Sequence, residues 1–212
     1  MAEKKTSKNV VGVLISGRGS NMKSILDRIA SGDLDARVAL VISNEPKAAG
    51  LPAARERDVV TLVIDHREST TREEHDRRMA EALEAKGVRL VCLAGYMRLL
   101  SPWFVERFEG RILNIHPSLL PSFPGKDAQR QAVEAGVKIS GCTVHYVDEH
   151  VDSGPIVLQE TVPVLDDDDP ETLAARILEK EHAIYGRAIA LHFSGRLRIA
   201  GRRVKGTGPP AG

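Results

Sequence analysis

The sequence predicts an α/β fold, with a mostly parallel twisted sheet and helices on both of its faces. Short β-branched runs alternate with amphipathic stretches along most of the chain, which is the pattern of βαβ units. The apolar runs are nearly uninterrupted, as in strands covered on both faces. With 42% hydrophobic residues among 212, the chain has enough apolar side chains to bury a sizeable core.

The predicted strands share this apolar, β-branched character. They are Val10–Ile15, Val38–Ser43, Val59–Ile64, Leu90–Leu93, Ile112–Ile115, Ser140–Val147 and Ile156–Val164. Between the first two strands, Met22, Ile25, Leu26 and Ile29 recur at the spacing of one buried helix face. The charged pattern of Thr71–Lys86 predicts a surface helix between the third strand and the fourth.

The last long helix has a clear start in the sequence. Asp169 is placed as an N-cap, Pro170 takes the first helical position and Glu171 lies in the first turn. The helix is predicted to run to about His192. The residues from Gly201 onward have little to bury, so we expect one domain over residues 1–200 and a mobile tail over 201–212.

Charge and targeting signals narrow the class of protein. Thirty Lys and Arg against 29 Asp and Glu leave a net charge of +1, which is not the footprint of a nucleic-acid-binding protein. The sequence shows neither a secretory signal nor a run of ~20 apolar residues, so we expect a soluble cytoplasmic protein without a membrane partner. Cys92 and Cys142 lie in predicted strands and are expected to be buried free thiols.

Two loops follow predicted strands at the edge where open parallel sheets bind ligands. Ser16–Asn21 is rich in glycine and opens a helix, so its backbone N–H groups and the helix dipole favour a phosphate. The alternative is a tight turn without a ligand. Ala94–Leu100 keeps apolar groups in a loop, which suits a flat, partly apolar ligand. The alternative is that these groups pack against the helix beginning near Ser101.

A third point follows the strand Ile112–Ile115. Asn114 brings an amide into an apolar strand, and His116 lies two residues later, so both side chains project to the same side. They are placed to converge on one carbonyl oxygen, a geometry suited to acyl-group chemistry. If the turn around Asp152 folds back, its carboxylate reaches His116 and favours the imidazolium. A structural histidine is the alternative.

One carboxylate interrupts the apolar face of the last helix. Glu181 shares a stripe with Ile177, Ile184 and Tyr185, so it is placed to bind an amine or to lie at a groove edge in water. No nucleophile elbow or activated cysteine is evident. His145 and His150 with nearby aspartates are the best metal candidates, but His145 belongs to a strand, and we expect no metal.

These motifs together resemble the phosphoribosylglycinamide formyltransferases, folate-dependent enzymes of purine biosynthesis. The matching segments are Leu14–Asn21 (LISGRGSN), Leu93–Arg98 (LAGYMR), Leu113–Pro121 (LNIHPSLLP), Asp152–Ile156 (DSGPI) and Glu181–Tyr185 (EHAIY). The match runs in order from about Val10 to Leu197. It departs at Pro124–Gln129, which has no histidine where some family members carry one.

The resemblance implies a Rossmann-like formyltransferase fold that moves a formyl group from 10-formyltetrahydrofolate to the amino group of glycinamide ribonucleotide. It implies a monomer or homodimer and no metal or redox cofactor. The implied catalytic set is Asn114, His116 and Asp152. Binding of the ribonucleotide is implied for Gly19, Ser20, Asn21 and Glu181, and binding of the folate for Arg72, Met97, Arg98, Leu99, Leu100, Asp148, Glu149, His150 and Val151.

Two other readings stay open at this point. Methionyl-tRNA formyltransferases and formyltetrahydrofolate hydrolases share the fold, but the first usually adds a basic RNA-binding domain and the second a regulatory domain. The chain has room for neither, and its charge balance disfavours tRNA. A non-catalytic nucleotide- or folate-binding module is the other alternative, and turnover distinguishes it from an enzyme.

Overall fold

The computed structural model describes residues 7–208 of the chain. They pack as two compact units, with the division between Ile112 and Leu113. The predicted α/β fold class is confirmed by solved structures of the same fold. The expectation of a single domain over residues 1–200 stays a prediction.

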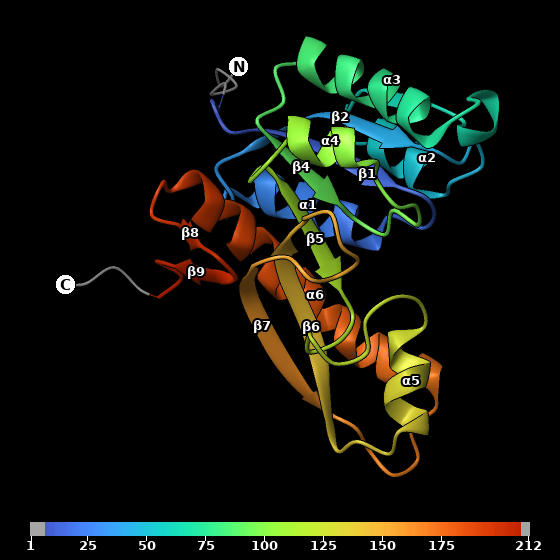
Figure 1. The fold of residues 1–212 in the computed structure, drawn as a ribbon, viewed down its shortest axis with the longest axis vertical. Helices are drawn as coiled ribbons and strands as arrows, with labels where there is room; N and C mark the ends of the chain where they lie inside the picture. Colours follow the sequence, from blue (N-terminus) through green and yellow to red (C-terminus); the bar gives the residue numbers. More distant parts are fainter. Residues whose placement is uncertain (1–6, 209–212) are drawn as a thin grey trace. The chain divides into compact units, whose positions relative to one another are not determined.

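The first unit is a parallel sheet flanked by helices (Figure 1). Its strands are β1 (Val10–Ile15), β2 (Arg37–Ser43), β3 (Thr61–Val63) and β4 (Leu90–Leu93). They lie in the order β3-β2-β1-β4, and β1 pairs in parallel with both β2 and β4. Every residue of β1 and β4 is buried, as their uninterrupted apolar runs predict. Because neighbouring strands are parallel, the loops after β1, β2 and β4 open at one edge of this sheet.

The described part of the first unit contains five helical segments. They are α1 (Ser20–Ser31), α2 (Gly50–Arg55), the short 3₁₀ helix η1 (His66–Glu68), α3 (Arg72–Ala85) and α4 (Pro102–Arg107). Thr71 and Ser101 accept backbone N–H groups at the starts of α3 and α4. In α1, Met22, Ile25 and Leu26 form the predicted buried face. The predicted helices are therefore confirmed, while α2 and η1 are additional.

The second unit is mostly antiparallel. Its strands are β5 (Ile112–His116), β6 (Ile139–Tyr146), β7 (Ile156–Pro163), β8 (Arg198–Ala200) and β9 (Arg203–Lys205), in the order β5-β6-β7-β9-β8. β6 pairs antiparallel with both β5 and β7. A short helix, α5 (Ala128–Glu134), lies in the connection from β5 to β6. The predicted Ser140–Val147 and Ile156–Val164 strands are thus confirmed to within a residue at each end.

Helix α6 (Pro170–Phe193) packs along β6 and β7 (Figure 1). Asp169 is its N-cap in a capping box with Thr172, and Pro170 is its first residue, as predicted. Its buried face includes Ile177, Ile184 and Tyr185. The long helix therefore covers one side of the strands that carry the polar cluster described below.

Two further features concern the end of the chain and membranes. Residues 203–205 form β9, which pairs with β8 in a small hairpin, and residues 209–212 of the expected mobile tail lie outside the described part. No helix between residues 7 and 208 combines the length and apolar character that a membrane-spanning segment requires.

Candidate active site

Strand β5 positions two of the predicted catalytic side chains. Asn114 lies opposite His145 of β6, and His116 lies opposite Thr143. Since alternate residues of a strand share a face, Asn114 and His116 project to the same side, as the sequence predicts. The His116 side chain is only 5% exposed, so its ring is largely shielded from water. The strand therefore fixes both groups from one rigid element.

The turn between β6 and β7 brings the third group. A Cβ atom at Gly154 would lie 1.9 Å from the carbonyl oxygen of Tyr146, so only glycine allows this close approach. The Tyr146 N–H donates to the carbonyl of Pro155 at 2.9 Å and closes the turn. Asp152 has a left-handed backbone, with φ of 51°. The turn folds back, as the sequence-based hypothesis required.

The three predicted catalytic residues meet in one cluster. His116 Nδ1 lies 3.3 Å from Asp152 Oδ2, and Asn114 Nδ2 lies 3.5 Å from Asp152 Oδ1. The Gly125 N–H donates to Asp152 Oδ2 at 2.8 Å. These contacts hold the carboxylate between the amide and the imidazole.

The protonation of His116 is governed by opposing effects. Its Nε2–H donates to the Phe123 carbonyl at 2.9 Å, so a second proton at Nδ1 would point at Asp152. Burial lowers the pKa of His116 from 6.5, and this outweighs the hydrogen bond to Phe123 and the charge of Asp152, which both raise it. The expected effect of Asp152 is present, but the expected net rise in the His116 pKa does not occur because the ring is desolvated.

The Asp152 carboxyl is held in its charged form. Burial alone would raise its pKa, but polar contacts with His145 and Gly125 and the charges of His116 and His145 prevail and lower it below 3.8. The cluster therefore contains a carboxylate beside a buried, mainly neutral imidazole near neutral pH. A negative charge arising beside His116 would increase its affinity for a proton.

His145 also belongs to this cluster. From the sequence alone, it was considered only as a metal ligand, and that role was rejected. It is 2% exposed, and its Nδ1–H donates to the Tyr146 carbonyl at 2.9 Å. In the neutral ring, Nε2 then accepts from Asn114 Nδ2 at 3.2 Å. This contact points the Asn114 amide nitrogen into the cluster. The contact between His145 and Asn114 depends on the pairing of β5 with β6, and hydrophobic periodicity does not predict which strands pair.

The glycine-rich loop lies in the first unit between β1 and α1. Gly19 has φ of 66°, and a Cβ atom there would lie 3.0 Å from the Gly50 Cα, so glycine is required twice over. Ser20 and Asn21 are the first residues of α1. Their backbone N–H groups belong to the helix N-terminus, where the dipole favours an anion. The predicted position of this loop is confirmed, and its phosphate ligand stays a prediction.

The loop after β4 presents apolar side chains to solvent. Met97 is 67% exposed and Leu99 55%, so these two do not serve as core contacts for α4. Arg98 and Leu100 are half-buried beside them. Exposed apolar groups on a loop are available for a ligand with a flat apolar part.

The remaining predicted binding residues are distributed over three elements. Glu181 lies on the buried face of α6 at 7% exposure, and Arg72 is an exposed first residue of α3. In the turn after β6, Asp148 accepts from the His150 N–H at 3.0 Å and the Ser153 hydroxyl at 2.7 Å. Glu149, His150 and Val151 are exposed there. These groups lie outside strand β5, which carries Asn114 and His116.

Cys92 lies in β4 and Cys142 in β6. Burial raises the pKa of the Cys142 thiol to about 12, with the Glu181 and Glu160 carboxylates adding to the rise, so this thiol is not an activated nucleophile. Both cysteines are buried, as predicted, and neither forms a disulfide within residues 7–208. Within residues 7–208, no three His, Cys, Asp or Glu side chains are grouped as metal ligands would be.

Comparison with known proteins places this arrangement in a family. The formyl transferase family profile matches residues 8–189, which span both units. The chain belongs to the formyl transferase family. A phosphoribosylglycinamide formyltransferase of Haemophilus influenzae is 43% identical over 89% of this chain and 89% of its own length. The crystal structure of glycinamide ribonucleotide transformylase 1 from Symbiobacterium toebii has 52% identity and a TM-score of 0.92 over 96% of each chain.

Other members of the formyl transferase family are much longer proteins. The trifunctional purine biosynthetic protein adenosine-3 of Drosophila melanogaster is 48% identical over 90% of this chain, which spans only 14% of that protein. The bacterial relatives are matched along nearly their whole length. The family relationship therefore covers the cluster on β5 and the turn after β6. It also covers the glycine-rich loop and the loop after β4, which are called the two ligand-side loops below.

Proposed function

We propose that this chain transfers the formyl group of 10-formyltetrahydrofolate to the amino group of glycinamide ribonucleotide, giving formylglycinamide ribonucleotide and tetrahydrofolate. The observation that carries the proposal is the cluster of Asn114, His116 and Asp152, in which His116 Nδ1 lies 3.3 Å from Asp152 Oδ2. Membership of the formyl transferase family supports it, as do relatives named for this reaction.

The reaction requires a group that stabilises negative charge on oxygen. The neutral amine attacks the formyl carbon, a new C–N bond forms, and charge develops on the formyl oxygen in a tetrahedral intermediate. Asn114 donates to that oxygen the N–H that faces Asp152 at 3.5 Å in the free protein. As the imidazolium, His116 donates a second hydrogen bond from Nδ1, exchanging its contact with Asp152 for the formyl oxygen. The intermediate then collapses as the C–N bond to the folate breaks. A water relays the proton from the attacking amine to the departing folate nitrogen.

Asp152 stabilises the protonated form of His116. Burial lowers the His116 pKa, so a neutral ring is favoured in the free protein, while the Asp152 charge acts in the opposite direction. Charge on the formyl oxygen adds to the Asp152 effect, so His116 takes a proton from solvent as the intermediate forms and returns it to solvent when the intermediate collapses. This stabilises the intermediate more than the bound substrate, as catalysis requires.

The proposal assigns the remaining predicted residues to binding. Gly19, Ser20 and Asn21 hold the ribonucleotide phosphate, and Glu181 meets its glycinamide end. The folate is contacted by Arg72, Met97, Arg98, Leu99 and Leu100 and by Asp148, Glu149, His150 and Val151. We propose that the protein is cytoplasmic and is a monomer or homodimer. Its function requires no metal, nucleic acid or membrane.

The decisive test of this function is formation of the folate product, followed by absorbance, with glycinamide ribonucleotide as acceptor. We expect product only when 10-formyltetrahydrofolate is the donor. Formate plus ATP is the control donor, and its use would overturn the folate assignment. Binding of both substrates without formylglycinamide ribonucleotide would instead indicate a non-catalytic module.

A further inference from the structure

Ser16 joins the two ligand-side loops of the first unit. It follows β1 and begins the glycine-rich loop, and its hydroxyl oxygen accepts the Met97 N–H at 2.8 Å. Its own N–H donates to the Gly95 carbonyl at 3.0 Å. One residue of the glycine-rich loop is therefore bonded through backbone and side chain to the loop after β4.

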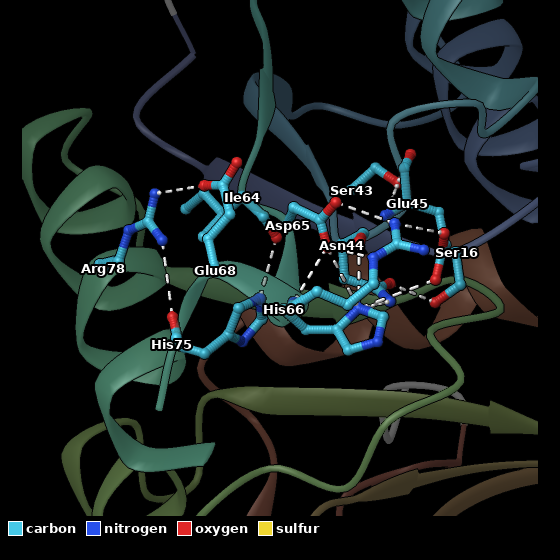
Figure 2. A network of polar contacts seen from close by, with 12 residues as sticks. Ser16, Ser43, Asn44, Glu45, Ile64, Asp65, His66, Glu68, His75 and Arg78 are labelled. Carbon is cyan, nitrogen blue, oxygen red and sulfur yellow. Dashed lines mark hydrogen bonds and ion pairs between the residues drawn. The ribbon is translucent and has the colours of Figure 1, made fainter. Parts of the chain in front are cut away.

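The Ser16 hydroxyl has a defined direction. Because its oxygen accepts from Met97, its proton is free to donate, and it does so to Asn44 Oδ1 at 2.6 Å. Asn44 is 2% exposed and lies just after β2, and its Nδ2 faces His66 Nδ1 at 3.2 Å. Figure 2 shows Ser16, Asn44 and His66 in one polar network beside Ser43 and Glu45. A buried, oriented amide thus fixes the hydroxyl that holds Met97.

The loop after β4 is fastened at its other end as well. Asp76 is 1% exposed on α3, and its Oδ2 accepts the Ser101 N–H at 2.5 Å. Between the two anchors, the Met97 and Leu99 side chains are 67% and 55% exposed. The backbone of the loop is held in place while its apolar groups face solvent, which lowers the ordering cost of binding a ligand there.

We propose that Ser16 is a positioning residue whose hydroxyl couples the glycine-rich loop to the loop after β4, so that the two substrates bind with mutually increased affinity. This inference rests on the proposed function for the identity of the two ligands. A phosphate on Gly19–Asn21 further restricts the motion of the loop that begins at Ser16, and the Ser16 hydroxyl passes this restriction to the Met97 backbone. By linkage, the folate must raise the affinity for the ribonucleotide by the same factor.

The coupling is measured by calorimetry on the intact chain with tetrahydrofolate and glycinamide ribonucleotide, which do not react with each other. For the unmodified chain, we expect each ligand to lower the dissociation constant of the other by about fivefold or more. In Ser16→Ala, this ratio of dissociation constants without and with the other ligand should fall below about two. Ser16→Thr keeps the hydroxyl and should keep most of the coupling.

A matched control removes a hydroxyl elsewhere in the same unit. Ser31 ends α1, and its hydroxyl can donate either to the Arg28 carbonyl at 3.1 Å or to Asp33 Oδ2 at 2.9 Å. Ser31→Ala should therefore keep the full coupling factor. Equal coupling in Ser16→Ala and the unmodified chain would overturn the inference, as would a factor of one in the unmodified chain. If the unmodified chain binds neither ligand, the proposed function itself fails.

Amide hydrogen exchange gives a second readout that requires no substitution. Addition of glycinamide ribonucleotide alone should slow exchange at the Met97 N–H of the unmodified chain, because that N–H donates to Ser16. In Ser16→Ala, this N–H should exchange about fivefold faster than in Ser16→Thr. Unchanged exchange at Met97 on ribonucleotide binding would contradict the coupling even if every variant failed to fold.

Discussion

His116 is a buried imidazole between a carbonyl and a carboxylate, and its pKa reflects the balance between them. Burial favours the neutral ring, while Phe123 and Asp152 favour the charged one. Because the folded pKa lies below 6.5, the unfolded chain binds a proton at mildly acidic pH that the folded chain does not. The stability contributed by this neutral ring is therefore present above pH 6.5 and is lost as the pH falls toward the folded pKa.

The first prediction concerns the influence of Asp152 on this ring. In Asp152→Asn, the carboxylate charge that raises the His116 pKa is lost, so the pKa should fall further below 6.5. NMR titration of the His116 ring in both proteins measures it. Asp148→Asn in the same turn is the control and should leave the His116 titration unchanged. A pKa that rises or stays constant in Asp152→Asn would contradict the proposed coupling.

For single residues, the sequence predicts the positions of side chains better than it predicts their protonation. The spacing of Asn114 and His116 sufficed to place them on one side of a strand, and the turn containing Asp152 reaches His116 as expected. The net fall in the His116 pKa was not predicted because it depends on how deeply the ring is buried. The roles of His145 and Ser16 depend on contacts across 31 and 81 residues, which local spacing does not contain.

Among the elements, the turn after β6 depends on one glycine. In Gly154→Ala, the new methyl group would occupy the space of the Tyr146 carbonyl, so the turn must shift and carry Asp152 away from His116. We expect kcat to fall by about tenfold or more, since positioning within about 1 Å matters for catalysis. Steady-state kinetics measure this loss.

The control for this substitution is a glycine with open space around it. Gly136 follows α5, and a Cβ atom there would meet nothing within 4 Å, although its φ of 66° disfavours alanine. Gly136→Ala should cost some stability and leave kcat nearly unchanged. Equal losses of kcat in the two variants would show that backbone strain, not the placement of Asp152, limits the rate.

Elements with a strong local signal were predictable, including the short helix α4 with Ser101 and Pro102 at its start, and elements without such a signal were not. The cap at Asp169 and the apolar stripe of α6 gave its start and its buried face. Helices α2 and α5, with six and seven residues, are too short to show a helical period. Strand β9 lies in the expected tail because its three residues are mostly exposed and lack an apolar run.

For the whole molecule, the proposed function assigns the ribonucleotide phosphate to the glycine-rich loop of the first unit. Gly19 and Gly32 flank α1 in the first unit, and both have left-handed backbones. In Gly19→Ala, strain and the close Gly50 backbone should displace the loop and raise KM for glycinamide ribonucleotide by about tenfold. Gly32→Ala carries similar backbone strain with nothing within 4 Å and should leave KM unchanged. Similar KM values in both variants, measured by initial rates, would contradict the phosphate assignment.

Fold class followed from the alternation of apolar runs and helices, but the arrangement of strands did not. The parallel order β3-β2-β1-β4 agrees with the βαβ pattern, whereas β5, β6 and β7 pair antiparallel. Apolar runs predict strands without stating their direction, which depends on connection geometry. For Glu181, the apolar stripe of α6 left two interpretations, an amine ligand and a groove edge in water, and the family resemblance implied the substrate-binding role.

The most direct measurement of the central claim is the single-turnover rate of formyl transfer in Asn114→Ala and His116→Ala. Each variant removes one donor to the formyl oxygen and should fold normally, bind both substrates and transfer the formyl group on the order of a hundredfold or more slowly. Circular dichroism and calorimetric binding establish the first two conditions. A rate equal to that of the unmodified chain in either variant would contradict the role given to that residue.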